Sequence, residues 1–488
     1  MFACLVCAAV VALAAPRVTG AAAERVEEGS PAGSLASSWD DEALGYDSVT
    51  AWLKALTSSP ECAAVTRLTS LGRSVEGRDV WGVEVSDRPG SDEAEPGFRF
   101  VAGMHGDEGV GVDLSLRLLL SLCEERNGEV VAGAHTWVVP MANPDGLEAR
   151  SRGNARGVDL NRDFPDPVHD DPGKGEGTVG REPETEALMK LILEERVHAG
   201  ASLHGGALAV SIPWDGSVEG EREEARSPDD AGFRWLGSNY AGACGLPMAA
   251  GTVDSATGYA FEGGMTNGAE WYPVYGGMQD YGYVHGGSLE VTVELGDDKW
   301  PHEDGAFSRA WEVHRPSLWA LLRAGTLGPG VTGTVVDVKT GKAVTTAHVR
   351  VDGVDSPPAV ERVGSVFGDF HRVLAPREDA YVVWAEAPEY EMSEAVAVTV
   401  SGEDGQERPR IEFKLRRVSR NRHLGRFVLD DHAYVRPDVL AALRRRRATP
   451  VLRGWVYGAL LGVVPVAAVV LALSTILRPG LRRRGRDV

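Results

Sequence analysis

The stretch Phe98-Arg-Phe-Val-Ala-Gly-Met-His-Gly-Asp-Glu-Gly-Val-Gly-Val-Asp-Leu-Ser-Leu-Arg-Leu-Leu-Leu120 decides the fold of this chain. Its first seven residues are mostly apolar, which predicts a buried β-strand at 98–104, and the leucines of its second half recur at helical spacing. His105 and Glu108 therefore lie on a turn between a strand and a helix. That turn is at the carboxyl end of the strand, where open α/β sheets bind their ligands.

His105 and Glu108 supply an imidazole and a carboxylate, and His204 follows 96 residues after the glutamate in Ser202-Leu-His-Gly-Gly206. Two imidazoles and one carboxylate are a typical catalytic zinc set, with the fourth coordination position open to water or substrate. A His-x-x-Glu pair alone is a weak signal, because it arises by chance in many proteins. The distant histidine and the motifs below make the zinc prediction specific.

Strands and helices alternate from about residue 48 to residue 325. The predicted strands lie at 80–85, 98–104, 136–140, 201–204 and 289–295, and the predicted helices at 113–123, 184–195, 230–241 and 308–322. This alternation predicts an α/β domain, in which a mixed β-sheet is flanked by helices. The turn residues of Gly325-Thr-Leu-Gly-Pro-Gly330 predict a hinge at the end of that domain.

A second region follows the hinge, at 331–415. Apolar residues alternate with period two at 331–338, 347–351, 381–387, 395–400 and 410–415, with turn residues between these segments. The pattern predicts a small all-β sandwich. Residues 416–453 are rich in arginine and are expected to form a stalk.

Several longer motifs occur in a fixed order along the chain. They are Leu71-Gly-Arg-Ser-Val-Glu-Gly-Arg-Asp-Val-Trp81, Val139-Pro-Met-Ala-Asn-Pro-Asp-Gly146, Arg152-Gly-Asn-Ala-Arg-Gly-Val-Asp-Leu-Asn-Arg162, Gly264-Met-Thr-Asn-Gly-Ala-Glu-Trp-Tyr-Pro-Val-Tyr-Gly-Gly-Met-Gln-Asp-Tyr281 and Val291-Thr-Val-Glu-Leu295. With the histidine motifs, this set resembles the zinc metallocarboxypeptidases, in the regulatory branch that contains carboxypeptidases D, E, M and N. The resemblance runs from about residue 48 to about residue 415. It implies the zinc carboxypeptidase fold at 48–325, a transthyretin-like domain at 331–415 and one Zn²⁺ per chain.

The resemblance also implies catalytic roles for individual residues. Glu294 matches the family's general base, which takes a proton from the metal-bound water and passes it to the leaving amine. Glu290 lies four residues earlier on the same strand face, and we interpret it as structural because the family's base aligns with Glu294. Arg152 matches the arginine that polarises the scissile carbonyl and stabilises the oxyanion. Asp159 resembles the aspartate that orients a zinc-bound histidine.

Substrate recognition is implied in the same way. Asn161 and Arg162 match the clamp for a free C-terminal carboxylate, which suits the planar fork of an arginine. Tyr272 corresponds to the tyrosine that closes over the substrate. Asp215 and Gln279 match the polar pocket with which this branch binds Lys or Arg, and a carboxylate at the floor of such a pocket discriminates against apolar side chains.

The chain departs from the family pattern near these residues. Asp163 follows Arg162 where the family usually has Asn, and its extra negative charge is expected to weaken binding of the terminal carboxylate. Leu295-Gly-Asp-Asp-Lys299 replaces a Leu-Ser-Cys-like stretch, and Gly286-Gly287 replaces bulkier residues. The segment 167–180 is an insertion without an assigned role.

Both ends of the chain contain apolar segments. Residues 1–23 are rich in Ala and Val and end in small residues, as in a secretory signal peptide, and an acidic, aperiodic stretch at 24–47 is expected to be a flexible lead. Residues 454–477 are 24 residues without a charge, which is long enough for a transmembrane helix. Five arginines lie on each side of it, so its orientation depends on the signal peptide. We therefore expect a single-pass type I membrane protein of the secretory pathway or plasma membrane, with 478–488 as a short cytoplasmic tail.

The cysteine content limits the possible disulfides, and the net charge limits the possible binding partners. Beyond the signal peptide the chain has Cys62, Cys123 and Cys244, an odd number that leaves at least one thiol unpaired and the pairing open. The net charge is −21, and residues 416–488 contain 16 Arg against four acidic residues, so the acidic excess lies in the rest of the chain. That excess argues against nucleic acid as a partner and favours the approach of cationic peptides.

Together these features predict a membrane-anchored zinc carboxypeptidase that removes C-terminal Lys or Arg from peptides or proteins in the secretory lumen or at the cell surface. One alternative is a carboxypeptidase with non-basic specificity, such as the removal of acidic residues. The other is a catalytically silent protein that keeps the scaffold for binding or adhesion. The presence of all three metal ligands and of Glu294 argues against the silent alternative.

Overall fold

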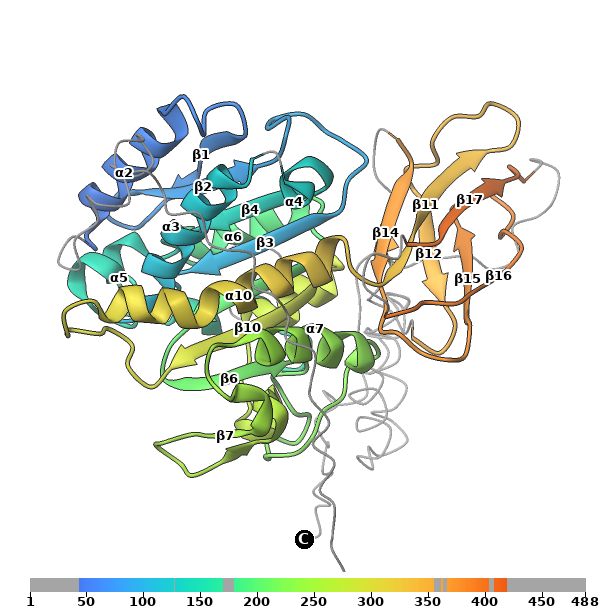
Figure 1. Cartoon of the computed structure of the whole chain (residues 1–488). Helices are drawn as coiled ribbons and strands as arrows, with labels where there is room; N and C mark the ends of the chain where they lie inside the picture. Colours follow the sequence, from blue (N-terminus) through green and yellow to red (C-terminus); the bar gives the residue numbers. More distant parts are fainter. Residues whose placement is uncertain are drawn as a thin grey trace, which may run out of the picture.

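The computed structural model describes residues 44–126, 128–169, 180–354, 361–362, 367–402 and 408–418. An α/β domain comes first in the chain, and a smaller region built from strands, here called the β-module (residues 330–418), lies beside it (Figure 1). Among the helices of these residues, none has the length and apolar character needed to cross a membrane. The predicted signal peptide, transmembrane helix and cytoplasmic tail, nearly all of the predicted stalk, and most of the flexible lead lie outside the described residues.

The α/β domain contains one eight-stranded mixed sheet, which confirms the predicted architecture. Its strand order is β1-β2-β4-β3-β5-β10-β6-β9, and β4, β3, β5 and β10 at its centre run parallel. The strands are β1 (Thr66–Arg73), β2 (Asp79–Val85), β3 (Gly97–Ala102), β4 (His135–Val139), β5 (Ala199–His204), β6 (Ala207–Ile212), β9 (Met265–Asn267) and β10 (Leu289–Gly296). A short hairpin of β7 (Thr252–Val253) and β8 (Ala260–Phe261) forms a separate two-stranded sheet.

Helices cover both faces of the sheet (Figure 1). One face packs against α3 (Gly109–Glu124), α7 (Asp230–Ala243) and α10 (Ala306–Thr326), and the other against α6 (Pro183–Glu194) and α9 (Met278–Tyr281). The other helices are short or peripheral: α2 (Tyr46–Ser58), α4 (Glu129–Gly133), α5 (Pro144–Ala149) and α8 (Gly268–Trp271). The main apolar cluster lies between the sheet and the first group of helices.

The five strands and four helices predicted for this domain are all present, but the hinge prediction was wrong at its first residues. Helix α10 continues through Gly325 to Thr326 instead of ending at 322. A Cβ on Gly325 would lie 2.6 Å from the Phe98 ring and 2.8 Å from the Cβ of Ala199. Gly325 is therefore explained by the close approach of the helix to the sheet, a long-range contact that the local pattern does not reveal.

The β-module consists of two packed sheets, as the period-two segments predicted. One sheet contains β11 (Gly330–Asp337), β14 (Asp369–Val373) and β17 (Arg410–Leu415), and the other contains β12 (His348–Val351), β13 (Glu361–Arg362), β15 (Tyr381–Glu386) and β16 (Val396–Val398). Apolar residues from both sheets form a core of their own. Strand β14 was not predicted, because all five of its residues are buried and polar side chains interrupt its alternation.

The structure shows which cysteines pair, which the sequence alone left open. Cys62 and Cys123 form a disulfide with their Cα atoms 5.2 Å apart, and Cys244 remains a free thiol. The bond joins the segment after α2 to the last turn of α3. It therefore ties the segment that follows α2 to α3, the helix that begins directly after Glu108.

Candidate active site

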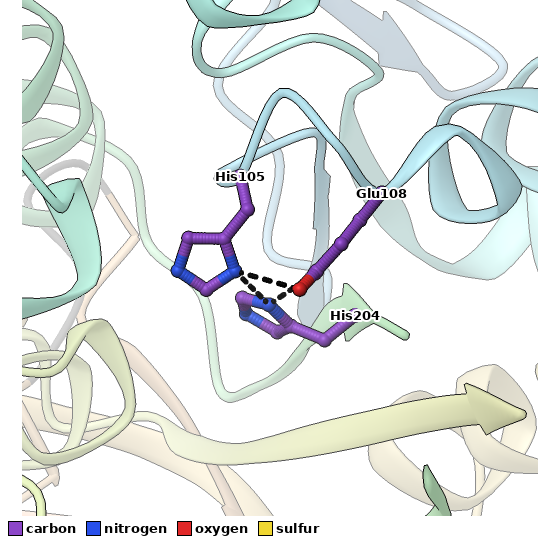
Figure 2. A group of neighbouring side chains, drawn as sticks. All are labelled: His105, Glu108 and His204. Atoms are coloured by element: carbon purple, nitrogen blue, oxygen red, sulfur yellow. Dashed lines mark hydrogen bonds and ion pairs between the residues drawn. The ribbon is translucent and has the colours of Figure 1, made fainter. Parts of the chain in front are cut away.

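His105, Glu108 and His204 come together at the carboxyl ends of β3 and β5, as the sequence predicted (Figure 2). His105 lies in the turn after β3, Glu108 immediately precedes α3, and His204 is the last residue of the neighbouring strand β5. The Nδ1 atoms of the two histidines are 3.1 Å apart. Oxygens of Glu108 lie 3.0 Å from Nδ1 of His105 and 2.9 Å from Nδ1 of His204.

This donor set fits a zinc ion. A tetrahedral ion with bonds of about 2.0–2.1 Å separates its ligand atoms by about 3.3 Å, which is close to the separations found here. Nε2 of His105 lies 3.1 Å from Oδ1 of Asp159, a contact that leaves the Nδ1 lone pair directed at the centre of the cluster. Burial opposes ionisation of Glu108, but hydrogen bonds from His105 and His204 hold the pKa of its carboxyl well below the usual range. The carboxyl group of Glu108 is thus ionised, which is the state that zinc requires of a carboxylate ligand.

Glu294 lies beside this cluster because of the strand register. Strand β10 runs parallel to β5, and Glu294 pairs with His204 across the ladder. Burial, followed by the nearby charge of Glu108, raises the pKa of Glu294 to about 8. A cation held by the three ligands would oppose this shift, because it favours the carboxylate. Glu294 is therefore placed to exchange a proton near neutral pH.

A cavity of about 240 Å³ joins the cluster to most of the predicted substrate-binding residues. The predicted site residues in its lining are His105, Glu108, Arg152, Asn161, Arg162, His204, Asp215, Tyr272 and Glu294. Asp159 and Gln279 contact this lining from outside, through His105 and Asp215 respectively. The structure thus brings together every residue that the motifs indicated.

Arg152 and Asp159 form a pair at the edge of the metal cluster. The Nε of Arg152 donates to Oδ2 of Asp159 over 2.9 Å, and its Nη1 lies 3.7 Å from Oε1 of Glu108. Asp159 also caps the short helix η1 (Leu160–Arg162) by accepting from the backbone N–H of Asn161. The aspartate therefore orients a metal ligand, an arginine and the start of the Asn161–Arg162 segment together.

Asn161 and Arg162 are held by neighbouring backbone groups. The side-chain oxygen of Asn161 accepts from the N–H of Met278 over 2.9 Å, and Arg162 donates to the carbonyl of Asn161. Arg162 is half-buried, and its positive charge partly opposes the rise that burial causes in the pKa of Asp215. Tyr272 is also half-buried, and burial raises the pKa of its hydroxyl to about 12, so it stays protonated and able to donate.

Asp215 is a buried member of the cavity lining, with 6% of its surface exposed. Its Oδ1 accepts from Nε2 of Gln279 over 2.9 Å, and Ser211 also hydrogen-bonds its carboxyl group. Asp280 fixes the backbone of Asp215 by accepting from its N–H. Burial raises the pKa of Asp215 to about 7, so ionisation of this carboxyl is costly until a cation enters the cavity.

The structure places the side chain of Asp163 away from the cavity. Its carboxylate does not line the cavity but accepts from the backbone N–H of Glu182 over 2.7 Å, and its carbonyl accepts from Arg181. The side chain is buried and faces the start of α6. It therefore anchors the end of the 167–180 insertion, most of which lies outside the described residues, and its carboxylate is directed at α6 and not at the cavity.

Other residues in the cavity lining were not predicted. Lys299 donates from Nζ to Oε1 of Glu108 over 2.9 Å, and Asp254 accepts from the indole N–H of Trp271, next to Tyr272. Thr292 and Ser211 also line the cavity. Thr292 lies two residues before Glu294, so period-two alternation on the strand is the signal that would have found it. Lys299 falls in the segment that departs from the family pattern.

Comparison with known proteins agrees with this geometry. Residues 49–317 match the model of the zinc carboxypeptidase family, Peptidase_M14. The carboxypeptidase N catalytic chain of Homo sapiens is 35% identical over 378 residues, covering 70% of this chain and 79% of that protein. Carboxypeptidase SOL1 of Arabidopsis thaliana is 39% identical over 337 residues, covering 67% of this chain and 64% of that protein.

Carboxypeptidase D of Mus musculus is 35% identical over 346 residues, which cover 67% of this chain but only 24% of that longer protein. The chain therefore spans less than two thirds of two of these relatives. The family match includes all three clustered ligands and Glu294, and it confirms the predicted zinc cofactor and fold. On the extent of the match and the identity to the human relative, the chain belongs to the zinc carboxypeptidase family, in the branch similar to carboxypeptidases D and N.

Proposed function

We propose that this chain is a zinc-dependent exopeptidase that hydrolyses the C-terminal residue, preferably Lys or Arg, from peptides or proteins. The observation that carries the proposal is a single cavity that is lined by the metal cluster, by Arg162 and by the buried carboxyl group of Asp215. The names of the relatives, which are carboxypeptidases D and N and carboxypeptidase SOL1, support the exopeptidase activity.

Each residue of the site is proposed to have its own role in the reaction. His105, Glu108 and His204 would hold the zinc, which when bound lowers the pKa of a coordinated water and polarises the scissile carbonyl. Glu294 accepts the proton of the attacking water and delivers it to the leaving amine, a transfer that its near-neutral pKa favours. Arg152 stabilises negative charge that develops on the carbonyl oxygen, since its guanidinium lies beside the cluster.

Arg162 and Asn161 bind the free C-terminal carboxylate of the substrate, which restricts cleavage to the last residue. The guanidinium of Arg162 offers two parallel N–H donors to that carboxylate. Tyr272 also lines the cavity, and its hydroxyl group, which remains protonated, donates a hydrogen bond to the bound substrate. An internal peptide segment has no carboxylate at this position and therefore binds poorly.

Asp215 sets the preference for a basic side chain. A Lys or Arg that enters the cavity loses water, and only a fixed anion can offset that cost. Gln279 supplies hydrogen bonds but no charge, so it orients the carboxylate of Asp215 and contributes less to the discrimination. An apolar side chain would leave this carboxylate without a partner of opposite charge.

The location of the activity is part of the proposal. The apolar segments at 1–23 and 454–477 support a type I membrane protein whose α/β domain faces the secretory lumen or the cell exterior. The disulfide between Cys62 and Cys123 is consistent with such an oxidising compartment. The β-module is proposed to be the transthyretin-like domain of the regulatory branch, supported by its two-sheet core and its position after the α/β domain.

The test compares Asp215→Asn with wild type on two peptides that end in Arg and in Leu. We expect wild type to prefer the Arg peptide, and the variant to lose at least tenfold (about 1.4 kcal/mol or more) in kcat/KM for it while keeping its rate on the Leu peptide. Asp163→Asn is the matched control, because it removes a buried carboxylate near the site that does not face the cavity. A wild-type preference for apolar or acidic termini, or an unchanged ratio in Asp215→Asn, would exclude basic specificity.

A further inference from the structure

The β-module contacts the α/β domain through charged residues of β14, the strand at its edge nearest that domain (Figure 1). The Nη2 atom of Arg372 lies 2.9 Å from both carboxylate oxygens of Asp229, and each side chain is only 2% exposed. Asp229 immediately precedes α7. Val373, the next residue of β14, packs into the main core of the α/β domain. The two regions therefore share a buried ion pair and continuous apolar packing.

Asp229 extends this contact toward the specificity residues. The hydroxyl of Tyr283 donates to Oδ2 of Asp229 over 2.8 Å, and Tyr283 is fully buried. Tyr283 belongs to a π-helical turn, η4 (Gly282–Gly286), that directly continues α9. Helix α9 carries Gln279 and Asp280, the two residues that hold the side chain and the backbone of Asp215.

Tyr283 also reaches Asp215 by a second route. Its ring lies 5.1 Å from the ring of Trp214, the residue immediately before Asp215, and 5.1 Å from the ring of Phe233 on α7. The rotamer of Tyr283 is therefore constrained by packing on one side and by its hydrogen bond to Asp229 on the other. Both routes end at the carboxylate that is proposed to bind the basic side chain.

Arg372 determines whether Asp229 can accept this hydrogen bond as an anion. Burial raises the pKa of Asp229, and the charge of Arg372 opposes that shift. Without the guanidinium, Asp229 would be a buried and uncompensated charge, which is strongly unfavourable. The carboxyl group would then take up a proton or draw in water, and either change disturbs the hydrogen bond that fixes Tyr283.

We propose that Arg372 of the β-module is a positioning residue for the specificity pocket, acting through Asp229 and Tyr283 on the segment that holds Asp215. This inference rests on the proposed function, because it assigns the contact chain Arg372–Asp229–Tyr283 to the pocket for the C-terminal side chain. It gives the β-module a role in substrate selection as well as in packing.

The experiment compares Arg372→Met with Arg196→Met in the full-length, zinc-loaded protein. Arg196 is the matched control, because it also forms an ion pair with β14, to Asp369, and among the described residues it neither contacts Tyr283 nor lines the cavity that contains Asp215. We expect Arg372→Met to lower the ratio of kcat/KM for the Arg and Leu peptides by about tenfold, mainly by raising KM for the Arg peptide. Arg196→Met is expected to leave the ratio unchanged even if it lowers the melting temperature.

Two further variants separate positioning from folding. Arg372→Lys retains the charge and is expected to restore most of the ratio. Tyr283→Phe removes only the hydroxyl, and its effect on the ratio should not add to that of Arg372→Met, because both act on one chain of contacts. If Arg372→Met does not fold, Tyr283→Phe and Arg372→Lys still measure the effect on the ratio.

The outcomes distinguish this inference from the proposed function. Wild type that does not prefer the Arg peptide would disprove the basic specificity, and the same variants would then be compared on the terminus that wild type prefers. An equal loss on both peptides, an equal effect of Arg196→Met, or additive effects of Tyr283→Phe and Arg372→Met would each show that Arg372 contributes to packing alone. The affinity of the zinc-loaded wild type and variants for free L-arginine gives a second measurement of the effect that does not depend on turnover.

Discussion

Glu290 and Glu294 lie on the same face of one strand, but their different surroundings give the two carboxylates different roles. Glu290 is fully buried and pairs with Arg99, and it also accepts a hydrogen bond from Ser288 over 2.8 Å. Glu294 lines the cavity beside the metal cluster, whereas Glu290 does not. The first carboxylate is committed to a structural ion pair, and the second is available for proton transfer.

Substitution by glutamine tests the two glutamates of the metal site separately. We expect Glu294→Gln to retain one zinc per chain but to lose about 10²–10⁴-fold in kcat, since it cannot accept a proton. Glu108→Gln removes an anionic ligand and is expected to lose the metal. Elemental analysis and steady-state kinetics on both variants check this, and a near-normal kcat in Glu294→Gln would move the general base to another residue.

The pH dependence of specificity follows from Asp215. Burial raises its pKa to about 7, so the carboxyl group is neutral below that pH and an anion above it. Because only the anion attracts a cationic side chain, kcat/KM for the Arg peptide is expected to rise relative to the Leu peptide as pH increases through about 7. The ratio removes the titration of Glu294, which affects both peptides. A ratio that is constant on both sides of pH 7 would contradict this assignment.

At the scale of elements, the register of β3, β5 and β10 aligns the site. Arg99 on β3 and Glu290 on β10 both pair with Gly200 on the strand between them. Their ion pair spans Gly200, which has no side chain to separate them. The same register places His204 and Glu294 side by side at the carboxyl ends of their strands. The buried ion pair therefore lies in one row of the sheet and the catalytic groups in another, four residues later.

Gly200→Ala tests this arrangement, because the new methyl group would collide with the carboxylate of Glu290. We expect a loss of about 1–3 kcal/mol in the free energy of unfolding, as for other overpacked cores. Gly242→Ala is the control: this helical glycine of α7 has open space around it, and alanine there is expected to be neutral or stabilising. Denaturant unfolding of both variants measures the difference, and equal stabilities would show that the sheet accommodates a side chain at position 200.

At the scale of the whole molecule, the catalytic machinery lies in the α/β domain, and the apolar segment at 454–477 comes after the β-module. The full-length protein is therefore expected to sediment with membranes and to resist extraction by alkaline carbonate. A chain truncated after Arg453 is expected to be soluble and to keep its kcat, because it retains both folded regions. Release of the full-length protein by carbonate would contradict a transmembrane anchor.

The sequence by itself was sufficient to predict the features that depend on local apolar patterns and on motifs. The strand, turn and helix around His105 and Glu108 were predicted from apolar spacing, and the ordered motifs indicated the site residues that line the cavity or contact its lining. The segments of the β-module with period-two alternation were predicted for the same reason: one face of each is buried and the other is not. These signals are local because the periodicity of a strand or helix is a local property.

Only the tertiary structure decided the features that depend on long-range contacts. Asp163 faces α6 and not the substrate, Gly325 continues a helix because that helix approaches Phe98, and Lys299 contacts Glu108 from 191 residues away in the chain. Arg372 reaches the specificity residues through Asp229, which is 143 residues away. In each case the residue type fits several environments, and the partner that selects among them is brought close only by the folding of the sheet and the docking of the β-module.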